Sequence, residues 1–229
     1  MNLSHSSPTE RHGAAGFVER REVIIPPLGL GGTLSIPADA YALVVFVHGS
    51  GSSRFSPRNR AVAQALNEQA IATLLFDLLT EDEEANRANV FDIELLAGRL
   101  VQAIDWIGGD PQLRHLPLGL FGASTGAAAA LVGAARLGNR VGAVVSRGGR
   151  PDLAGPALDE IKTPTLLIVG GRDFGVIELN EEALARLQGP KAIEIVPGGT
   201  HLFQEPGALE AVMAEAARWF KTYLAQGSA

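Results

Sequence analysis

A serine stands between two glycines in the segment Gly122-Ala123-Ser124-Thr125-Gly126, which matches the pattern G-x-S-x-G. A short apolar run precedes the segment and an alanine-rich stretch follows it, so the segment marks a strand-to-helix turn. A sharp turn of this kind strains the serine backbone, and the residues two positions away must then lack side chains. The alternative is that these residues are small only so that the helix can pack closely on a sheet. The strand–turn–helix context favours a nucleophilic serine.

A serine hydroxyl is a weak nucleophile and needs a base. The sequence has five histidines, of which two lie near the N-terminus, one precedes a predicted strand and one opens a Gly-Ser loop; these are His5, His12, His115 and His48. His201 remains, in a loop directly after a predicted strand. By elimination we predict His201 as the base; the alternative is a histidine that caps the next segment.

The base requires a carboxylate that orients its ring. Asp173 follows the apolar run of residues 164–169, so it would lie at the same edge of the sheet as the serine. Asp152, after the preceding strand, is the alternative acid. Asp77 also ends a strand but precedes the serine in the chain, which is more typical of a structural residue. We therefore predict Asp173 as the acid and keep Asp152 open.

Acyl transfer also requires donors for the negative charge that develops on the carbonyl oxygen. The first predicted donor is the backbone N–H of Thr125, the residue after the serine. The second is the Ser50 amide in the loop "HGSGSS", which follows the apolar run of residues 42–47. The alternative for this loop is a flexible turn without a catalytic role.

Apolar runs alternate along the chain with segments of helical spacing, which predicts an α/β fold with a mostly parallel sheet covered by helices on both faces. Ligands bind such sheets at the carboxyl ends of the strands. The predicted strands are residues 17–27, 31–37, 42–47, 71–77, 117–122, 141–146, 164–169 and 192–196. The predicted helices are residues 58–70, 91–108, 125–137, 178–188 and 206–224. We expect a disordered tail over residues 1–16 and a single domain over residues 17–229.

Composition limits the class of protein. The net charge of −6 argues against nucleic-acid binding, and no apolar run approaches the length of a membrane span. The absence of cysteine suits a reducing compartment, so we predict a cytoplasmic protein. We expect no metal and no cofactor, because the sequence has no metal-spaced histidine pair, P-loop lysine or full dinucleotide-binding pattern. The expected partner is a small ester-type molecule, and a homodimer is the alternative to a monomer.

The chain order Ser124, Asp173, His201, together with the segments HGSGSS, GASTG, GGRD and GGTH, resembles the α/β-hydrolase superfamily. Within it, the short chain is similar to the dienelactone hydrolase family. Dienelactone hydrolases use a cysteine nucleophile, whereas this chain has no cysteine, so the serine gives it the character of an esterase-type relative. The resemblance implies a serine hydrolase that cleaves a small carboxylic ester, lactone or thioester through an acyl-enzyme. The alternatives are a non-catalytic binding or regulatory protein, and an acyltransferase or perhydrolase with the same triad.

Only residues 147–163 separate the strand after the serine helix from the strand that bears the acid, so we expect no large cap domain and an open site. Three arginines near the predicted site, Arg54, Arg58 and Arg147, are candidates for binding an anionic part of the substrate. The alternative for each is a surface salt bridge, for instance with the acidic loop 81–84.

Overall fold

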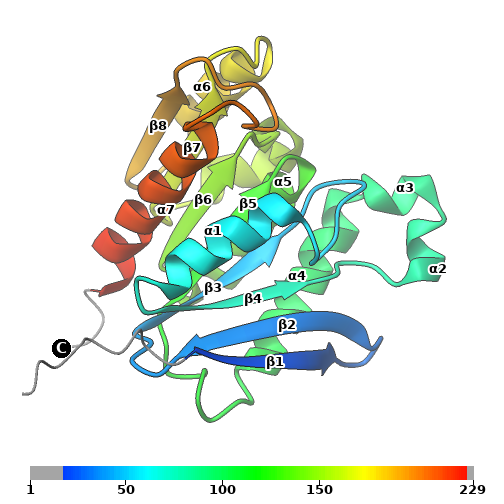
Figure 1. The fold of residues 1–229 in the computed structure, drawn as a ribbon. Helices are drawn as coiled ribbons and strands as arrows, with labels where there is room; N and C mark the ends of the chain where they lie inside the picture. Colours follow the sequence, from blue (N-terminus) through cyan, green and yellow to red (C-terminus); the bar gives the residue numbers. More distant parts are fainter. Residues whose placement is uncertain (1–17, 226–229) are drawn as a thin grey trace, which may run out of the picture.

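A single mixed sheet of eight strands organises the computed structural model, which describes residues 18–225 (Figure 1). The predicted tail, residues 1–16, lies outside the described residues. The strands lie in the order β1-β2-β4-β3-β5-β6-β7-β8; β1 and β2 run antiparallel to their neighbours and β3 to β8 are parallel. The strands are β1 Val18–Ile25, β2 Leu30–Pro37, β3 Ala42–Val47, β4 Ile71–Phe76, β5 Leu118–Ala123, β6 Ala143–Arg147, β7 Thr165–Gly170 and β8 Lys191–Val196. The predicted α/β class and mostly parallel sheet are confirmed.

Helices cover both faces of the sheet. In Figure 1, α1 and α7 lie in front of the strands, and α4 and α5 lie behind them. The helices are α1 Pro57–Asn67, α2 Glu81–Glu84, α3 Arg87–Val90, α4 Ile93–Ile107, α5 Thr125–Leu137, α6 Val176–Arg186 and α7 Ala208–Leu224, with the 3-10 segments η1 Gly138–Arg140 and η2 Pro151–Glu160. Two apolar cores therefore flank the sheet.

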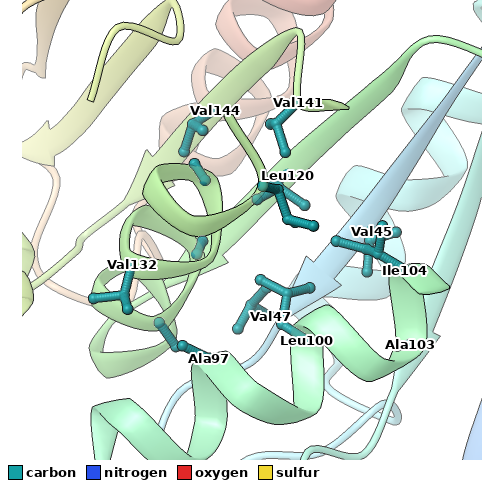
Figure 2. Close-up of a cluster of buried hydrophobic side chains, with 14 of the residues drawn as sticks. Val45, Val47, Ala97, Leu100, Ala103, Ile104, Leu120, Val132, Val141 and Val144 are labelled. Carbon is teal, nitrogen blue, oxygen red and sulfur yellow. The ribbon is translucent and has the colours of Figure 1, made fainter. Parts of the chain in front are cut away.

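The residues of β3 show how one strand serves both cores. Successive side chains of a strand point to opposite faces, so a strand covered on both sides must be apolar throughout. Leu43, Val45 and Val47 face the core beneath α4 and α5, and the alternate residues Val44 and Phe46 face the core beneath α1 and α7. Figure 2 shows Val45 and Val47 packed against side chains of α4.

Helix α4 owes its position to its apolar stripe and its N-cap. The Asp92 carboxylate accepts a hydrogen bond from the Leu95 N–H at 3.0 Å, which satisfies one of the free donors of the first turn. Leu100 and Ile104, one turn apart, then enter the core (Figure 2). The stripe that predicted residues 91–108 as a helix is the face that packs on the sheet.

Two connections carry more regular structure than the sequence predicts. The acidic loop 81–84 forms the short helix α2, because Thr80 and Glu83 make a reciprocal capping box. The hydrogen bond from the Thr80 backbone, followed by that from Arg99, keeps the pKa of Glu83 below its usual value. The connection between β6 and β7 forms η2, which packs against α5 and α6.

The carboxyl edge of the parallel strands carries no large cap within residues 18–225, as predicted. The connection that would hold a cap in a larger relative is occupied by η2. Among these residues, no helix is both long and apolar enough to cross a membrane.

Substitutions at two glycines test how closely α5 packs on the sheet. A side chain at Gly126 would collide with the backbone carbonyl groups of Val47 and His48, whereas a side chain at Gly98 in α4 would meet open space. We expect Gly126→Ala to destabilise the fold by about 3 kcal/mol or more, because backbone atoms cannot move aside. Gly98→Ala should stabilise it by about 0.5–1 kcal/mol through helix propensity.

Urea unfolding followed by circular dichroism measures both changes. Equal stability of the Gly126→Ala variant and the parent would contradict the close packing of α5 on β3.

Candidate active site

The turn between β5 and α5 presents Ser124 in a strained conformation. Its φ of 51° and ψ of −125° lie in a region that side-chain-bearing residues rarely adopt. A Cβ atom at Gly122 would lie 2.5 Å from the Cα atom of Ala127, and one at Gly126 would strike the carbonyls that end β3. Both glycines of the pattern are therefore required by backbone contact.

The structure brings the three predicted catalytic side chains into one hydrogen-bonded chain. Ser124 Oγ lies 3.3 Å from His201 Nε2, and His201 Nδ1 lies 2.7 Å from Asp173 Oδ2. Because Nδ1 donates to the carboxylate, Nε2 is left to accept the serine proton. The Asp173 side chain is 12% exposed and that of His201 is 38% exposed, so the carboxylate is shielded while the ring reaches the cavity.

Backbone and side-chain bonds hold the two loops that carry the acid and the base. The Asp173 N–H donates to the Gly170 carbonyl, and the Arg172 N–H donates to the Gly199 carbonyl of the neighbouring loop. In the histidine loop, Thr200 donates through its N–H and its hydroxyl to the Glu205 carboxylate at 3.0 and 2.7 Å. These hydrogen bonds, first that from the hydroxyl, keep the pKa of Glu205 below its usual value.

Glu205 is a supporting residue that sequence reasoning missed. Its only signal in the sequence is an acid five positions after a threonine in a loop, a pattern that many surface loops share. Asp152, the alternative acid, bonds Arg150 through both carboxylate oxygens at 2.9 and 2.8 Å. It makes no hydrogen bond to His201 among the described residues, whereas Asp173 does.

The two residues that carry the predicted oxyanion donors, Ser50 and Thr125, are in contact. The Ser50 N–H donates to the Thr125 hydroxyl at 2.9 Å, so this donor already has a partner. The Thr125 N–H belongs to the first residue of α5 and has no carbonyl within the helix to bond. The loop also lies close to Ser124 at Gly49, because a Cβ atom at Gly49 would lie 2.9 Å from the Cβ atom of Ser124.

His48 anchors the loop that contains Ser50. The ring is 7% exposed, accepts a hydrogen bond from the Leu78 N–H at 3.2 Å through Nε2, and donates through Nδ1 to the Gly49 carbonyl at 3.0 Å. Burial lowers the pKa of His48, against the opposing influence of the Gly49 carbonyl and the carboxylates of Asp77 and Glu84. The ring is thus a neutral structural bridge.

A cavity of about 270 Å³ opens on the serine. It lies at the small end of ligand-binding pockets, which are typically about 300–1,000 Å³. The lining residues are Gly49, Ser50, Ser52, Ser56, Arg58, Ala123, Ser124, Arg147, Gly148, His201 and Leu202. Among residues 18–225 no group of three or more histidine or acidic side chains is arranged to hold a metal ion.

The three candidate arginines have different surroundings. Arg54 forms an ion pair with Asp77 and does not line this cavity. Arg58 and Arg147 do line it. Burial, and then the positive charge of Arg58, lower the pKa of Arg147 to about 10, so it remains a cation at neutral pH.

The buried His48 predicts a pH-dependent stability. Its folded-state pKa lies below the unfolded value of about 6.5, so as the pH falls through 6.5 the unfolded chain binds a proton that the folded chain does not. The free energy of unfolding should therefore decrease between pH 7.5 and 5, and His48→Gln should make this decrease smaller. At pH 7.5 the same substitution should cost about 1–3 kcal/mol, because a buried backbone group loses its partner.

Urea unfolding at the two pH values measures these quantities. The exposed His115 supplies the control, because His115→Gln should leave the stability at pH 7.5 unchanged. An unchanged pH dependence in the His48→Gln variant would contradict the neutral bridge.

Comparison with known proteins identifies relatives of this chain. Two curated proteins of Mycobacterium tuberculosis, from strains CDC 1551 / Oshkosh and ATCC 25618 / H37Rv, are 56% identical over 206 residues, and both are named "Putative phosphoribosyl transferase". The match covers 90% of this chain and 46% of each relative, so the chain spans about half the length of these proteins.

Solved structures match almost end to end. A dienelactone hydrolase from Anabaena variabilis ATCC 29413 is 53% identical with a TM-score of 0.87, and the match covers 92% of this chain and 99% of that one. Est1E from Butyrivibrio proteoclasticus, at 17% identity, shares the fold with a TM-score of 0.76, over 89% of this chain and 99% of that one. The family described as "Alpha/beta hydrolase domain" matches residues 40–221. With the serine turn, the sheet and this match in agreement, the chain belongs to the alpha/beta hydrolase family.

Proposed function

We propose that the protein is a serine hydrolase that cleaves a small carboxylic ester, lactone or thioester through an acyl-enzyme. The observation that carries the proposal is the continuous contact from Ser124 Oγ through the His201 ring to the Asp173 carboxylate. A nucleophile, a base and an orienting acid in this order are what acyl transfer needs. The family supports hydrolysis, and the triad geometry supports attack on a carbonyl carbon.

In the first half of the reaction, Ser124 Oγ attacks the substrate carbonyl carbon while His201 Nε2 takes the hydroxyl proton. Asp173 holds the Nδ1–H and stabilises the imidazolium that forms. The carbonyl oxygen becomes an oxyanion beside the Thr125 N–H, at the N-terminus of α5, where the helix dipole favours negative charge. The bond from the carbonyl carbon to the leaving oxygen, or to the leaving sulfur of a thioester, then breaks, and Nε2 returns the proton to that leaving atom.

In the second half, a water molecule takes the place of the alcohol. His201 Nε2 removes its proton, the oxygen attacks the acyl carbon, and the bond to Ser124 Oγ breaks as the serine regains a proton. The acid product leaves and the site is restored. A lactone follows the same path, except that its alcohol stays attached to the acyl chain until water releases the product.

The size of the cavity limits the substrate. A volume of about 270 Å³, with no cap domain over the described sheet edge, suits a compact acyl group rather than a long lipid chain. The transferase activity in the name of the Mycobacterium tuberculosis relatives is that of chains about twice as long. The dienelactone hydrolase with 53% identity matches 92% of this chain and 99% of its own, and we take it as the better guide to the chemistry.

Replacing the nucleophile tests the proposal directly. The parent protein should hydrolyse p-nitrophenyl acetate and react with a fluorophosphonate probe at Ser124. Ser124→Ala should lose both properties, because it lacks the hydroxyl that contacts His201, and should retain the parent's circular dichroism spectrum. Hydrolysis that persists in the folded variant would remove Ser124 from the mechanism.

The two aspartates near the site form a matched pair of variants. Asp173→Asn should reduce kcat by about 10³–10⁴-fold, because the amide no longer holds the His201 tautomer that accepts the serine proton. Asp152→Asn, which removes a carboxylate that bonds Arg150, should leave kcat unchanged. Steady-state hydrolysis of p-nitrophenyl acetate compares them. The reverse ranking would transfer the acid role to Asp152.

A further inference from the structure

Arg147 is a buried cation in the wall of the catalytic cavity. It is the last residue of β6, the strand beside the one that leads to Ser124, and it is 7% exposed. Its Nε and one terminal nitrogen are buried without a hydrogen-bond partner among residues 18–225. A buried polar group with no partner is rare in proteins, and it indicates either strain or a missing ligand.

A second cation lies beside it. Arg58, at the start of α1, lines the same cavity, and its Nε is also buried without a partner among the described residues. The two positive charges oppose each other, since Arg58 contributes to lowering the pKa of Arg147. Two unpaired guanidinium groups facing one small space make the folded protein less stable than a neutral lining would.

Several other arginines with partly buried side chains form ion pairs with carboxylates. Arg54 pairs with Asp77, Arg99 with Glu83, and Arg150 with Asp152. Within residues 18–225, neither Arg58 nor Arg147 forms an ion pair, and no acidic side chain lines the cavity. Among the described residues no carboxylate is therefore paired with these two cations, which line the cavity that opens on Ser124.

We propose that the substrate carries an oxoanion, a carboxylate or a phosphate, which Arg147 and Arg58 bind while its ester carbonyl lies on Ser124. This inference rests on the proposed function and specifies its substrate class. Guanidinium groups bind carboxylate and phosphate oxygens through paired N–H donors, and such bonds are strong in a shielded site. The small cavity places the anion only a few bonds from the scissile carbonyl.

Two esters with the same leaving group and chain length test the proposal. Mono-p-nitrophenyl glutarate ends in a carboxylate, whereas p-nitrophenyl pentanoate ends in a methyl group. The parent protein should prefer the anionic ester in kcat/KM by about 10- to 100-fold, the range expected for a hydrogen bond to a charged group. Equal kcat/KM values for the two esters would overturn the proposal.

The cavity arginines can then be replaced one at a time. Arg147→Met keeps an unbranched apolar stem, removes the guanidinium and should remove most of the preference for the anionic ester; Arg58→Met should reduce it as well. Arg60→Gln is the matched control, because Arg60 lies on α1 two residues further on, is exposed and does not line the cavity. It should keep the full preference. If Arg147→Met does not fold, the preference for the anionic ester is measured in Arg147→Lys and Arg58→Met instead.

The ratio of kcat/KM for the anionic ester to kcat/KM for the neutral ester distinguishes a loss of anion binding from a general loss of activity. A variant that loses the preference for the anionic ester, with a smaller change in kcat/KM for the neutral ester, supports the anion subsite. An equal decrease in kcat/KM for both esters assigns the arginines a structural role and overturns the proposal. Inorganic phosphate and glutarate, used as inhibitors of pentanoate hydrolysis, distinguish the two oxoanions. The better-matched anion should inhibit competitively in the parent and lose inhibition in the Arg58→Met variant.

A binding measurement keeps this inference separate from the proposed function. Calorimetric titration of glutarate and of phosphate into the Ser124→Ala protein needs no turnover. Anion binding that is present in Ser124→Ala and absent from the double variant Ser124→Ala, Arg58→Met supports the subsite, even if the parent protein hydrolyses no ester. Ser124-dependent hydrolysis with neither an anion preference nor anion binding would sustain the hydrolase and overturn the subsite.

Discussion

The contact between the start of α5 and the end of β3 is the constraint on which the site depends. Gly126 rests directly on the last carbonyls of β3, and no larger residue fits there. This contact fixes the position of the helix N-terminus, which in turn forces Ser124 into its left-handed conformation. The loop that contains Ser50 begins where β3 ends, so the same contact also sets the distance between Ser124 and that loop. A shift of α5 away from the sheet would separate both parts at once.

Most of the fold could be predicted because its signals are local. The apolar runs of β3 to β7 are buried on both faces, and the stripe of α4 meets the core at helical spacing. The acidic segment was predicted as a loop because its helix is only one turn long and depends on a capping box, not on an apolar face. The connection to β7 was likewise too irregular to predict, since it winds as a 3-10 segment around Gly155.

The site also has a part that could be predicted from the sequence and a part that could not. Ser124, Asp173 and His201 were predictable because each follows a strand, and parallel strands bring their carboxyl ends to one edge. The surroundings of the arginines were not predictable, since Arg54 and Arg58 are four residues apart in one segment and yet one has a carboxylate partner and the other faces the cavity. Likewise, no sequence pattern pairs Thr200 with Glu205. Such contacts depend on how loops fold back, which periodicity does not encode.

In the proposed reaction, the hydrogen bond between the Ser50 N–H and the Thr125 hydroxyl would fill the place of the substrate oxygen in the resting site. An arriving carbonyl oxygen must compete with that hydroxyl for the donor. A neutral carbonyl competes on nearly equal terms, whereas an oxygen that has gained negative charge is the much stronger acceptor. The exchange of partners therefore becomes favourable only as the tetrahedral state forms. If the proposed ester hydrolysis holds, one threonine lets the loop discriminate between a bound ester and a reacting one.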